Sequence, residues 1–251
     1  MSSKKADARE RVKAMREEQA RQERKRERLT RFGIAGAVIA AVVIIGAAVI
    51  FTRGGDDTPA ALPATVSGSG GGIVVEQADS DVTVDVWMDF LCPHCKDFED
   101  LNGAALAELG QSGQATVVYH PLTFTGGTYS ARANNAFACA ANEGKAAEFA
   151  TAAFASPQQW SDDALLSLGE SAAIGGGYES CVNADTYDAW VTDVSKRAQE
   201  EQIQATPTVF VNGEELPSTS WSPEGITAAI EAVAAGGAVS DAVTPAPATT
   251  E

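Results

Sequence analysis

The feature that most constrains the fold is a pair of cysteines, Cys92 and Cys95, that directly follows an apolar run. Residues 82–91 carry apolar side chains at every second position, and further apolar side chains lie on the second face, as in a central β-strand. Residues 95–110 have apolar side chains at spacings of three and four, which predicts a helix that stops at Gly110. The sequence therefore predicts a strand, a short loop that holds both cysteines, and a helix that begins close to Cys92.

This position favours a reactive sulfur at Cys92. Free backbone N–H groups and the helix dipole favour negative charge at a helix start, so a thiol there is expected to have a lowered pKa and to react as a thiolate. Pro93 fits the first turn, where its missing N–H costs nothing, and His94 can add a donor or a positive charge near the same sulfur. Cys95, one turn deeper, is expected to be the buried resolving thiol.

A C-x-x-C pair also occurs as half of a structural zinc site. The sequence has no second C-x-x-C; its other cysteines are Cys139 and Cys181, and its two histidines are His94 and His120. None of these positions has the spacing of zinc ligands. We therefore predict a redox loop and no metal site, and we expect His120 to be a packing or surface residue.

A second motif follows about 110 residues after the cysteine pair. Residues 206–213 predict a strand that opens at Thr206-Pro207 and closes in an Asn-Gly turn. Together with a C-x-x-C at a helix start, this motif resembles the proline loop of the thioredoxin fold. The resemblance implies a cis peptide that packs beside the redox sulfurs and offers backbone groups to an extended substrate.

The ordered set of motifs resembles a DsbA-type thiol-disulfide oxidoreductase of the thioredoxin superfamily, of the membrane-anchored kind found in actinobacteria. The resemblance covers about residues 73–235 and implies an α/β thioredoxin fold with an inserted helical domain at about 128–202. It assigns catalytic roles to Cys92, His94 and Cys95, and substrate binding to Thr206 and Pro207. The motifs are the strand before Cys92, the cysteine loop, a strand at 115–122, the helical insert, the Thr-Pro-Thr strand, and a last helix that opens at Ser222-Pro223-Glu224.

One position departs from the family pattern. DsbA-type enzymes often carry a buried acid six residues before the first cysteine, and Val86 occupies that position here. Asp85 and Asp89 flank it, but a strand's period of two places both on the opposite face. Either acid could take over the role, or both could be solvated or capping residues, so the predicted catalytic set contains neither.

Charge divides the chain into two parts. Residues 1–31 hold 12 of the 18 Lys and Arg with 6 acids, whereas residues 54–251 hold 5 basic and 28 acidic residues. Between them, residues 32–52 are uncharged and apolar, long enough for a bilayer core of about 30 Å. We expect a cytoplasmic basic segment at 1–31, a single transmembrane helix at 32–52 and an extracytoplasmic C-terminal part. A cleaved signal peptide is the alternative; the long basic region and the lack of a clear A-x-A site disfavour it.

The remaining segments connect or stabilise the domain. Residues 53–72 predict a flexible linker, and residues 236–251 a disordered tail. In an exported protein four cysteines allow three pairings, and we expect Cys92 with Cys95 and Cys139 with Cys181, the second pair joining two parts of the insert. The alternative for Cys139 and Cys181 is two buried free thiols.

The predicted chemistry is thiol-disulfide exchange. A stabilised thiolate at Cys92 would favour the reduced enzyme, so we expect an oxidase that introduces disulfides into reduced exported proteins. The sequence predicts no cofactor and no nucleic-acid site. The resemblance implies reoxidation by a membrane quinone-linked partner of the DsbB or vitamin-K-epoxide-reductase (VKOR) type. The alternatives are a disulfide reductase or isomerase, and a non-catalytic anchored binding or chaperone module.

Overall fold

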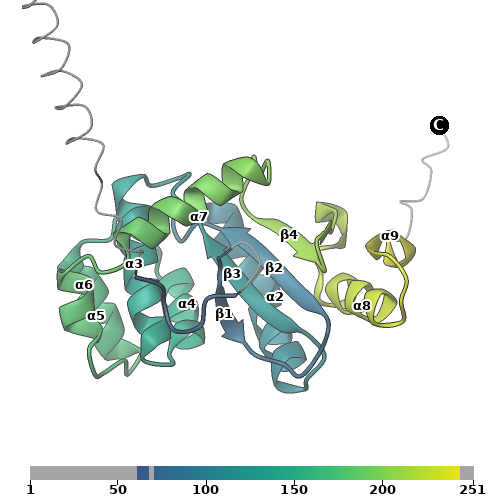
Figure 1. The fold of residues 1–251 in the computed structure, drawn as a ribbon, viewed down its shortest axis with the longest axis horizontal. Coiled ribbons are helices and arrows are strands. Elements are labelled where there is room, and N and C mark those ends of the chain that lie inside the picture. The colour runs from purple at the N-terminus through teal and green to yellow at the C-terminus, as the bar shows by residue number, and fades with distance from the viewer. Residues whose placement is uncertain (1–60, 68–70, 244–251) are drawn as a thin grey trace, which may run out of the picture. The chain divides into compact units, whose positions relative to one another are not determined.

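A five-stranded mixed sheet forms the centre of the computed structural model, which describes residues 61–67 and 71–243. The strand order is β1-β3-β2-β4-β5 (Figure 1). Strand β2 pairs in parallel with β3 and antiparallel with β4, and β1 pairs antiparallel with β3. The strands are β1 (Ile73–Glu76), β2 (Thr83–Met88), β3 (Thr116–Pro121), β4 (Thr208–Val211) and β5 (Glu214–Glu215).

Helices cover the sheet and form an insertion between β3 and β4. In Figure 1 α3, α4, α5 and α6 gather at one side of the sheet, α7 runs from them toward β4, and α8 and α9 lie at the other side. This is a mixed α/β, thioredoxin-like fold with a helical insertion, as the resemblance implies. The helices are α2 (Pro93–Gln111), then α3 (Thr128–Asn142), α4 (Ala146–Ala155), α5 (Asp162–Ser171), α6 (Tyr178–Asn183) and α7 (Asp188–Glu200) of the insertion, then the short 3₁₀ turn Ser218–Ser220, α8 (Pro223–Ala234) and α9 (Val239–Ala242).

Strand β2 is central because both of its faces are apolar. Val86 and Trp87 point to opposite faces and both are buried. Tyr119 of β3 is the register partner of Val86, and its hydroxyl donates to Glu99 of α2 at 2.6 Å, so α2 covers this face. The cysteine loop leaves β2 and enters α2 directly, which places it at one end of the sheet.

The insertion has its own aromatic core and a covalent link. Phe90, which follows β2, contacts the rings of Phe137, Phe149 and Phe154 at centroid distances of 5.1–5.5 Å. Cys139 of α3 and Cys181 at α6 form a disulfide with their Cα atoms 5.8 Å apart. These contacts fix α3, α4 and α6 against one another and against the end of β2.

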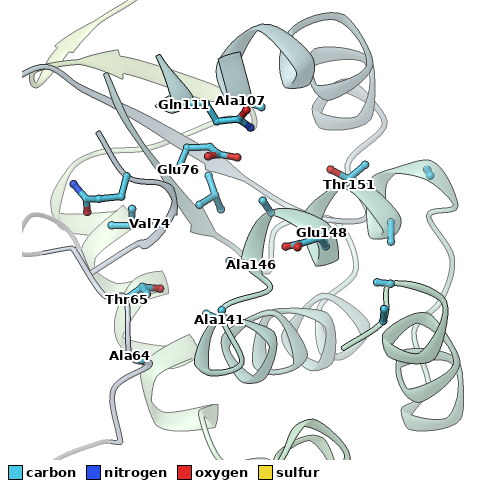
Figure 2. A pocket seen from close by; sticks show the side chains of 18 of the residues that line it. Ala64, Thr65, Val74, Glu76, Ala107, Gln111, Ala141, Ala146, Glu148 and Thr151 are labelled. Carbon is cyan, nitrogen blue, oxygen red and sulfur yellow. The ribbon is translucent and has the colours of Figure 1, made fainter. Parts of the chain in front are cut away.

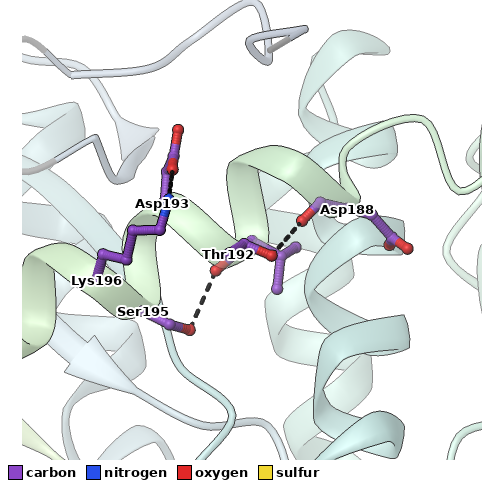
Figure 3. Close-up of polar contacts among 6 residues, drawn as sticks. Asp188, Thr192, Asp193, Ser195 and Lys196 are labelled. Carbon is purple, nitrogen blue, oxygen red and sulfur yellow. Dashed lines mark hydrogen bonds and ion pairs between the residues drawn. The ribbon is translucent and has the colours of Figure 1, made fainter. Parts of the chain in front are cut away.

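Helix α7 buries one side and exposes the other. Trp190 is buried and its indole N–H donates to the carbonyl of Gly71 at 2.8 Å. Figure 3 shows the polar contacts along the helix: Thr192 donates to the carbonyl of Asp188 at 3.0 Å, and Lys196 pairs with Asp193 at 3.0 Å. These local contacts are solvated, whereas the buried side of α7 packs against the rest of the domain; its buried residues are Trp190, Val191, Val194 and Ala198.

Part of the predicted linker belongs to the folded domain. Pro63 is buried, the N–H of Ala64 donates to Asn142 at 2.8 Å, and Val66 forms a bridge with Ile73. Residues of the predicted flexible segment therefore contact the domain at 63–66. The Gly, Ser and Pro residues of the segment are typical of linkers, so the sequence pattern does not indicate these contacts.

The C-terminal end also differs from the prediction of a disordered tail. Residues 239–242 form α9, and Val239 is buried. The predicted basic segment 1–31, the predicted transmembrane helix 32–52 and the predicted tail beyond residue 243 lie outside the described residues. Within 61–67 and 71–243, no helix is both long and apolar enough to cross a membrane.

Candidate active site

The cysteine loop adopts the predicted helix start. Cys92 is the N-cap residue of α2 with extended backbone angles, and Pro93 occupies the first turn. The carbonyl of Cys92 accepts the first helical N–H groups, those of Cys95 and Lys96, both at 3.1 Å. Cys92 therefore lies at the positive end of the α2 dipole, a position that favours negative charge.

The proline loop lies beside the first sulfur. The peptide between Thr206 and Pro207 is cis, and the Cys92 thiol donates to the carbonyl oxygen of Thr206 at an Sγ–O distance of 3.2 Å. Pro207 is buried, while Thr206 is partly exposed. The structure thus brings together three of the predicted site residues, Cys92, Thr206 and Pro207.

Cys95 lies beneath the surface, one turn further along α2. It is 1% exposed, and both Cys92 and Cys95 carry free thiols in this structure. Burial raises the pKa of Cys95 well above the usual thiol value, while the backbone N–H of Asp89, 3.4 Å from its sulfur, acts in the opposite direction. Cys95 is therefore the protected sulfur of the pair.

His94 is exposed at the surface of the first turn of α2. Its side chain is 83% exposed, and the ring nitrogen Nδ1 lies 4.0 Å from a carboxylate oxygen of Asp97. The structure therefore places this predicted catalytic residue on the surface next to an acid. Any influence of His94 on Cys92 acts through space and solvent.

Two aspartates left out of the predicted set have defined partners. Asp89 is fully buried and accepts three hydrogen bonds. Asp85 pairs with Nε2 of the buried His120 at 2.8 Å, and this histidine stacks on Trp87 with ring centroids 4.1 Å apart. His120 is thus a packing residue of the sheet. Asp89 adjoins the cysteines, and the sequence signal for it was its position three residues before Cys92.

The buried face around Val86 contains an acid that comes from α2. Glu99, one turn after Cys95, accepts the hydrogen bond from Tyr119, and burial raises the pKa of Glu99. Its carboxyl group points along the helix toward Gly103, where an added Cβ atom would lie 2.7 Å from the carboxyl oxygen. Glu99 therefore points away from Cys95 and does not take the place of the acid that the family pattern puts at Val86.

A cavity of about 1190 Å³ lies between β1, α2 and α4. Figure 2 shows Glu76 and Gln111 on one side of it and Glu148 of α4 on another. Burial, and then the charge of Glu148, raise the pKa of Glu76, while a hydrogen bond with Gln111 lowers it. The cavity lining includes neither Cys92 nor Cys95, so this acidic cleft is separate from the redox loop.

Comparison with known proteins agrees with this geometry. A protein-family profile described as Thioredoxin matches residues 69–232, more than half of the chain, and the chain belongs to this family. No curated protein matches the chain.

Solved structures of bacterial thiol-disulfide oxidoreductases resemble the domain. Oxidised DsbA of Mycobacterium tuberculosis has a TM-score of 0.55 and 26% identity, over 70% of this chain and 95% of that one. The disulfide bond oxidoreductase DsbG of the same organism has a TM-score of 0.54 and 26% identity, over 74% and 93%. MdbA, a thiol-disulfide oxidoreductase of Actinomyces oris, has a TM-score of 0.54 and 21% identity, over 61% and 80%, a likeness of fold. The domain thus has DsbA-like structural neighbours.

Proposed function

We propose that this protein is a DsbA-like thiol-disulfide oxidoreductase that introduces disulfide bonds into exported proteins through a Cys92–Cys95 disulfide. The observation that carries the proposal is the position of Cys92, at the N-terminus of α2 with its sulfur 3.2 Å from the Thr206 carbonyl. The buried Cys95 lies one turn further along α2. Cys92 is 6% exposed and Cys95 1%, so Cys92 is the less buried, attacking sulfur and Cys95 the protected resolving thiol, the two parts that disulfide exchange needs.

The reaction proceeds in two exchanges. A client thiolate attacks Sγ of Cys92 in the oxidised enzyme; the new client–Cys92 bond forms, the Cys92–Cys95 bond breaks, and its electron pair leaves on Cys95, which then takes up a proton. A second client thiolate attacks the client sulfur of the mixed disulfide, and Cys92 leaves as a thiolate. The client is oxidised by two electrons, and both enzyme thiols are then reduced.

The helix start supports the oxidase direction. We expect the dipole of α2, of which Cys92 is the N-cap, to stabilise the thiolate of this residue, the product of the second exchange. Stabilising the reduced enzyme makes its disulfide a stronger oxidant. Turnover then requires reoxidation, for which we propose a membrane quinone-linked partner of the DsbB or VKOR type.

The proposed location follows from the sequence. The apolar segment 32–52, with the basic segment 1–31 before it, would anchor the protein by a single transmembrane helix with the N-terminus cytoplasmic. The acidic domain would then lie outside the cytoplasm, where disulfides persist. Cys139–Cys181 would be a structural disulfide in that compartment.

The test is oxidation of a reduced two-cysteine peptide by the oxidised full chain, with Cys92→Ser and Cys95→Ser as variants. Wild type should oxidise one peptide per enzyme, and both variants should lose this activity. Cys95→Ser should accumulate a mixed disulfide at Cys92 with an activated client. A reduction potential near that of thioredoxin, about −270 mV, would favour a reductase instead. Unchanged activity in Cys92→Ser would favour a non-catalytic binding module and overturn the proposal.

A further inference from the structure

Asp89 forms hydrogen bonds with both redox cysteines through its backbone. Its carbonyl accepts the N–H of Cys92 at 3.0 Å, and its own N–H donates to the sulfur of Cys95 at 3.4 Å. The orientation of the two peptide groups of this residue therefore determines where both cysteines lie. A small rotation of Asp89 would move a donor away from the resolving sulfur.

The side chain of Asp89 holds those peptide groups in place. It is 0% exposed and accepts three hydrogen bonds: from the N–H of Leu91 at 2.8 Å, from the hydroxyl of Ser130 at 2.7 Å, and from the N–H of Thr125 at 2.7 Å. A buried carboxylate is costly unless such donors surround it, and charge-assisted bonds of this length are strong. All three partners donate, so the site is built to hold a carboxylate.

The three donors come from different parts of the fold. Leu91 belongs to the cysteine loop, Thr125 to the loop after β3, and Ser130 to the first turn of α3. The two loops also touch, because a Cβ atom at Gly126 would overlap the Leu91 side chain. Asp89 thus ties the cysteine loop to the beginning of the helical insertion.

We propose that Asp89 is a positioning residue that, together with Ser130, makes the helical insertion a determinant of the reduction potential. The inference rests on the proposed function, because it assigns a role in the client-oxidation step in which Cys95 leaves as a thiolate. The anchored N–H of Asp89 then donates to that thiolate. The insertion acts on the Cys95 sulfur in two steps: the hydroxyl of Ser130 holds the carboxylate of Asp89, and the backbone N–H of Asp89 contacts the sulfur.

Two effects of Asp89 oppose each other. Its negative charge disfavours a thiolate at Cys95, whereas its backbone N–H favours one. Three donors offset the carboxylate charge, while the N–H contacts the sulfur directly. The donor effect therefore dominates. The same N–H also contacts the Cys95 sulfur in the reduced enzyme, in which both thiols are free, so loss of the side-chain anchor should destabilise the reduced enzyme and make its disulfide a weaker oxidant.

The experiment compares Asp89→Asn and Ser130→Ala with wild type in the full chain. The Asn amide places an NH₂ group against one of the three donors, and Ser130→Ala removes one donor and leaves the carboxylate. Matched controls are Asp193→Asn and Ser195→Ala on α7, at polar contacts shown in Figure 3. The first readout is the equilibrium constant with glutathione. The second is the alkylation rate of Cys95 against pH in a Cys92→Ser background.

For Asp89→Asn we expect about a tenfold fall in the oxidising equilibrium constant, which corresponds to about 30 mV for a two-electron couple. Ser130→Ala should shift it in the same direction by a smaller factor, and Cys95 alkylation should require higher pH in both variants. The two α7 controls should match wild type. If Asp89→Asn does not fold, Ser130→Ala decides the question.

Folded variants with lowered stability but an unchanged potential and an unchanged alkylation profile would overturn the inference, because Asp89 would then be structural only. The proposed function fails separately, if wild type does not oxidise a reduced client. The potential and the Cys95 alkylation profile are measured without a client, so a shift in them would support the role of Asp89 even in that case.

Discussion

The sulfur of Cys92 lies 3.2 Å from the carbonyl oxygen of Thr206, although 114 residues separate them in the sequence. The contact joins the start of α2 to the loop before β4, and the pairing of β2 with β4 brings these two loops to the same end of the sheet. A client that is disulfide-bonded to Cys92 would therefore lie next to the backbone of Thr206 and Pro207. Cys95 lies one turn deeper in α2 and is 1% exposed.

The first prediction concerns the order in which the two thiols react. Because burial raises the pKa of Cys95 and its side chain is 1% exposed, an alkylating reagent at pH 7 should modify Cys92 and leave Cys95 intact. In Cys92→Ser, we expect Cys95 to react at least about 100-fold more slowly than an ordinary thiol, since only the small thiolate fraction reacts. Mass spectrometry of the reduced protein after timed alkylation measures both rates. Equal labelling of the two cysteines would contradict the burial argument.

Sequence patterns predicted the elements that carry the site, within a few residues. The apolar run 82–91 contains β2 (Thr83–Met88), and the expected last helix at Ser222-Pro223 is α8, with Ser222 as its N-cap. The period-two pattern and the capping pattern succeed here because one local interaction decides the conformation: burial of alternate side chains in β2, and the Ser222 cap in α8. The helix α2 begins at Pro93, two residues earlier than the apolar spacing indicates, because a first turn needs no apolar side chain.

Other features depend on contacts that no local pattern contains. Strand β1 (Ile73–Glu76) follows a Gly-rich stretch and has too few residues for a clear period, so its pairing with β3 decides its conformation. The depth of Asp89 depends on donors that lie 36 and 41 residues away in the sequence, at Thr125 and Ser130. The position of the His94 side chain depends on which side of the first turn faces solvent. The sequence predicts a role for His94 near the Cys92 sulfur, and in the structure its ring lies 4.0 Å from Asp97.

The second prediction concerns the disulfide of the insertion. Cys139 and Cys181 close a loop with a sequence separation of 42, for which the chain-entropy model gives about 4 kcal/mol of stabilisation. The double variant Cys139→Ala/Cys181→Ala should lose about this free energy of unfolding in urea, and should still oxidise a reduced peptide, because neither cysteine touches the redox loop. Under reducing conditions wild type and the variant should have similar stabilities. Loss of activity in a folded variant would show that the disulfide also shapes the active site.

The third prediction uses Glu99, the half-buried acid on α2. Burial raises the pKa of Glu99, so the fold favours its protonated form. The stability that Glu99 contributes is full below its unfolded pKa, near 4.5, and is lost as the pH rises through the higher folded pKa. Glu99→Gln keeps an acceptor for Tyr119 and removes the charge, so it should gain stability relative to wild type as the pH rises from 4 to 7, by about 1 kcal/mol.

Urea unfolding at several pH values measures this difference. Glu108→Gln, an exposed acid on the same helix, is the matched control and should give a flat difference across the range. If Glu99→Gln is equally flat, the carboxyl group is solvated and its burial does not penalise the charge. A variant destabilised at every pH would instead show that the Gln amide does not replace the carboxyl group in the hydrogen bond with Tyr119.

The fourth prediction separates the two ways in which His94 could act on Cys92. The ring is 83% exposed and the nearby Asp97 side chain 78% exposed, so charge effects between them and the sulfur are weakened by water and by salt. His94→Gln should therefore change the equilibrium constant with glutathione by less than about fivefold, the limit set by about 1 kcal/mol for an exposed pair. Asp97→Asn should shift the equilibrium constant in the opposite direction, toward a stronger oxidant, because it removes a negative charge near the helix start.

Both shifts should shrink when the salt concentration is raised to about 1 M, where the screening length falls to about 3 Å. A shift of tenfold or more that persists in high salt would instead mean that His94 bonds directly to the Cys92 sulfur during the reaction.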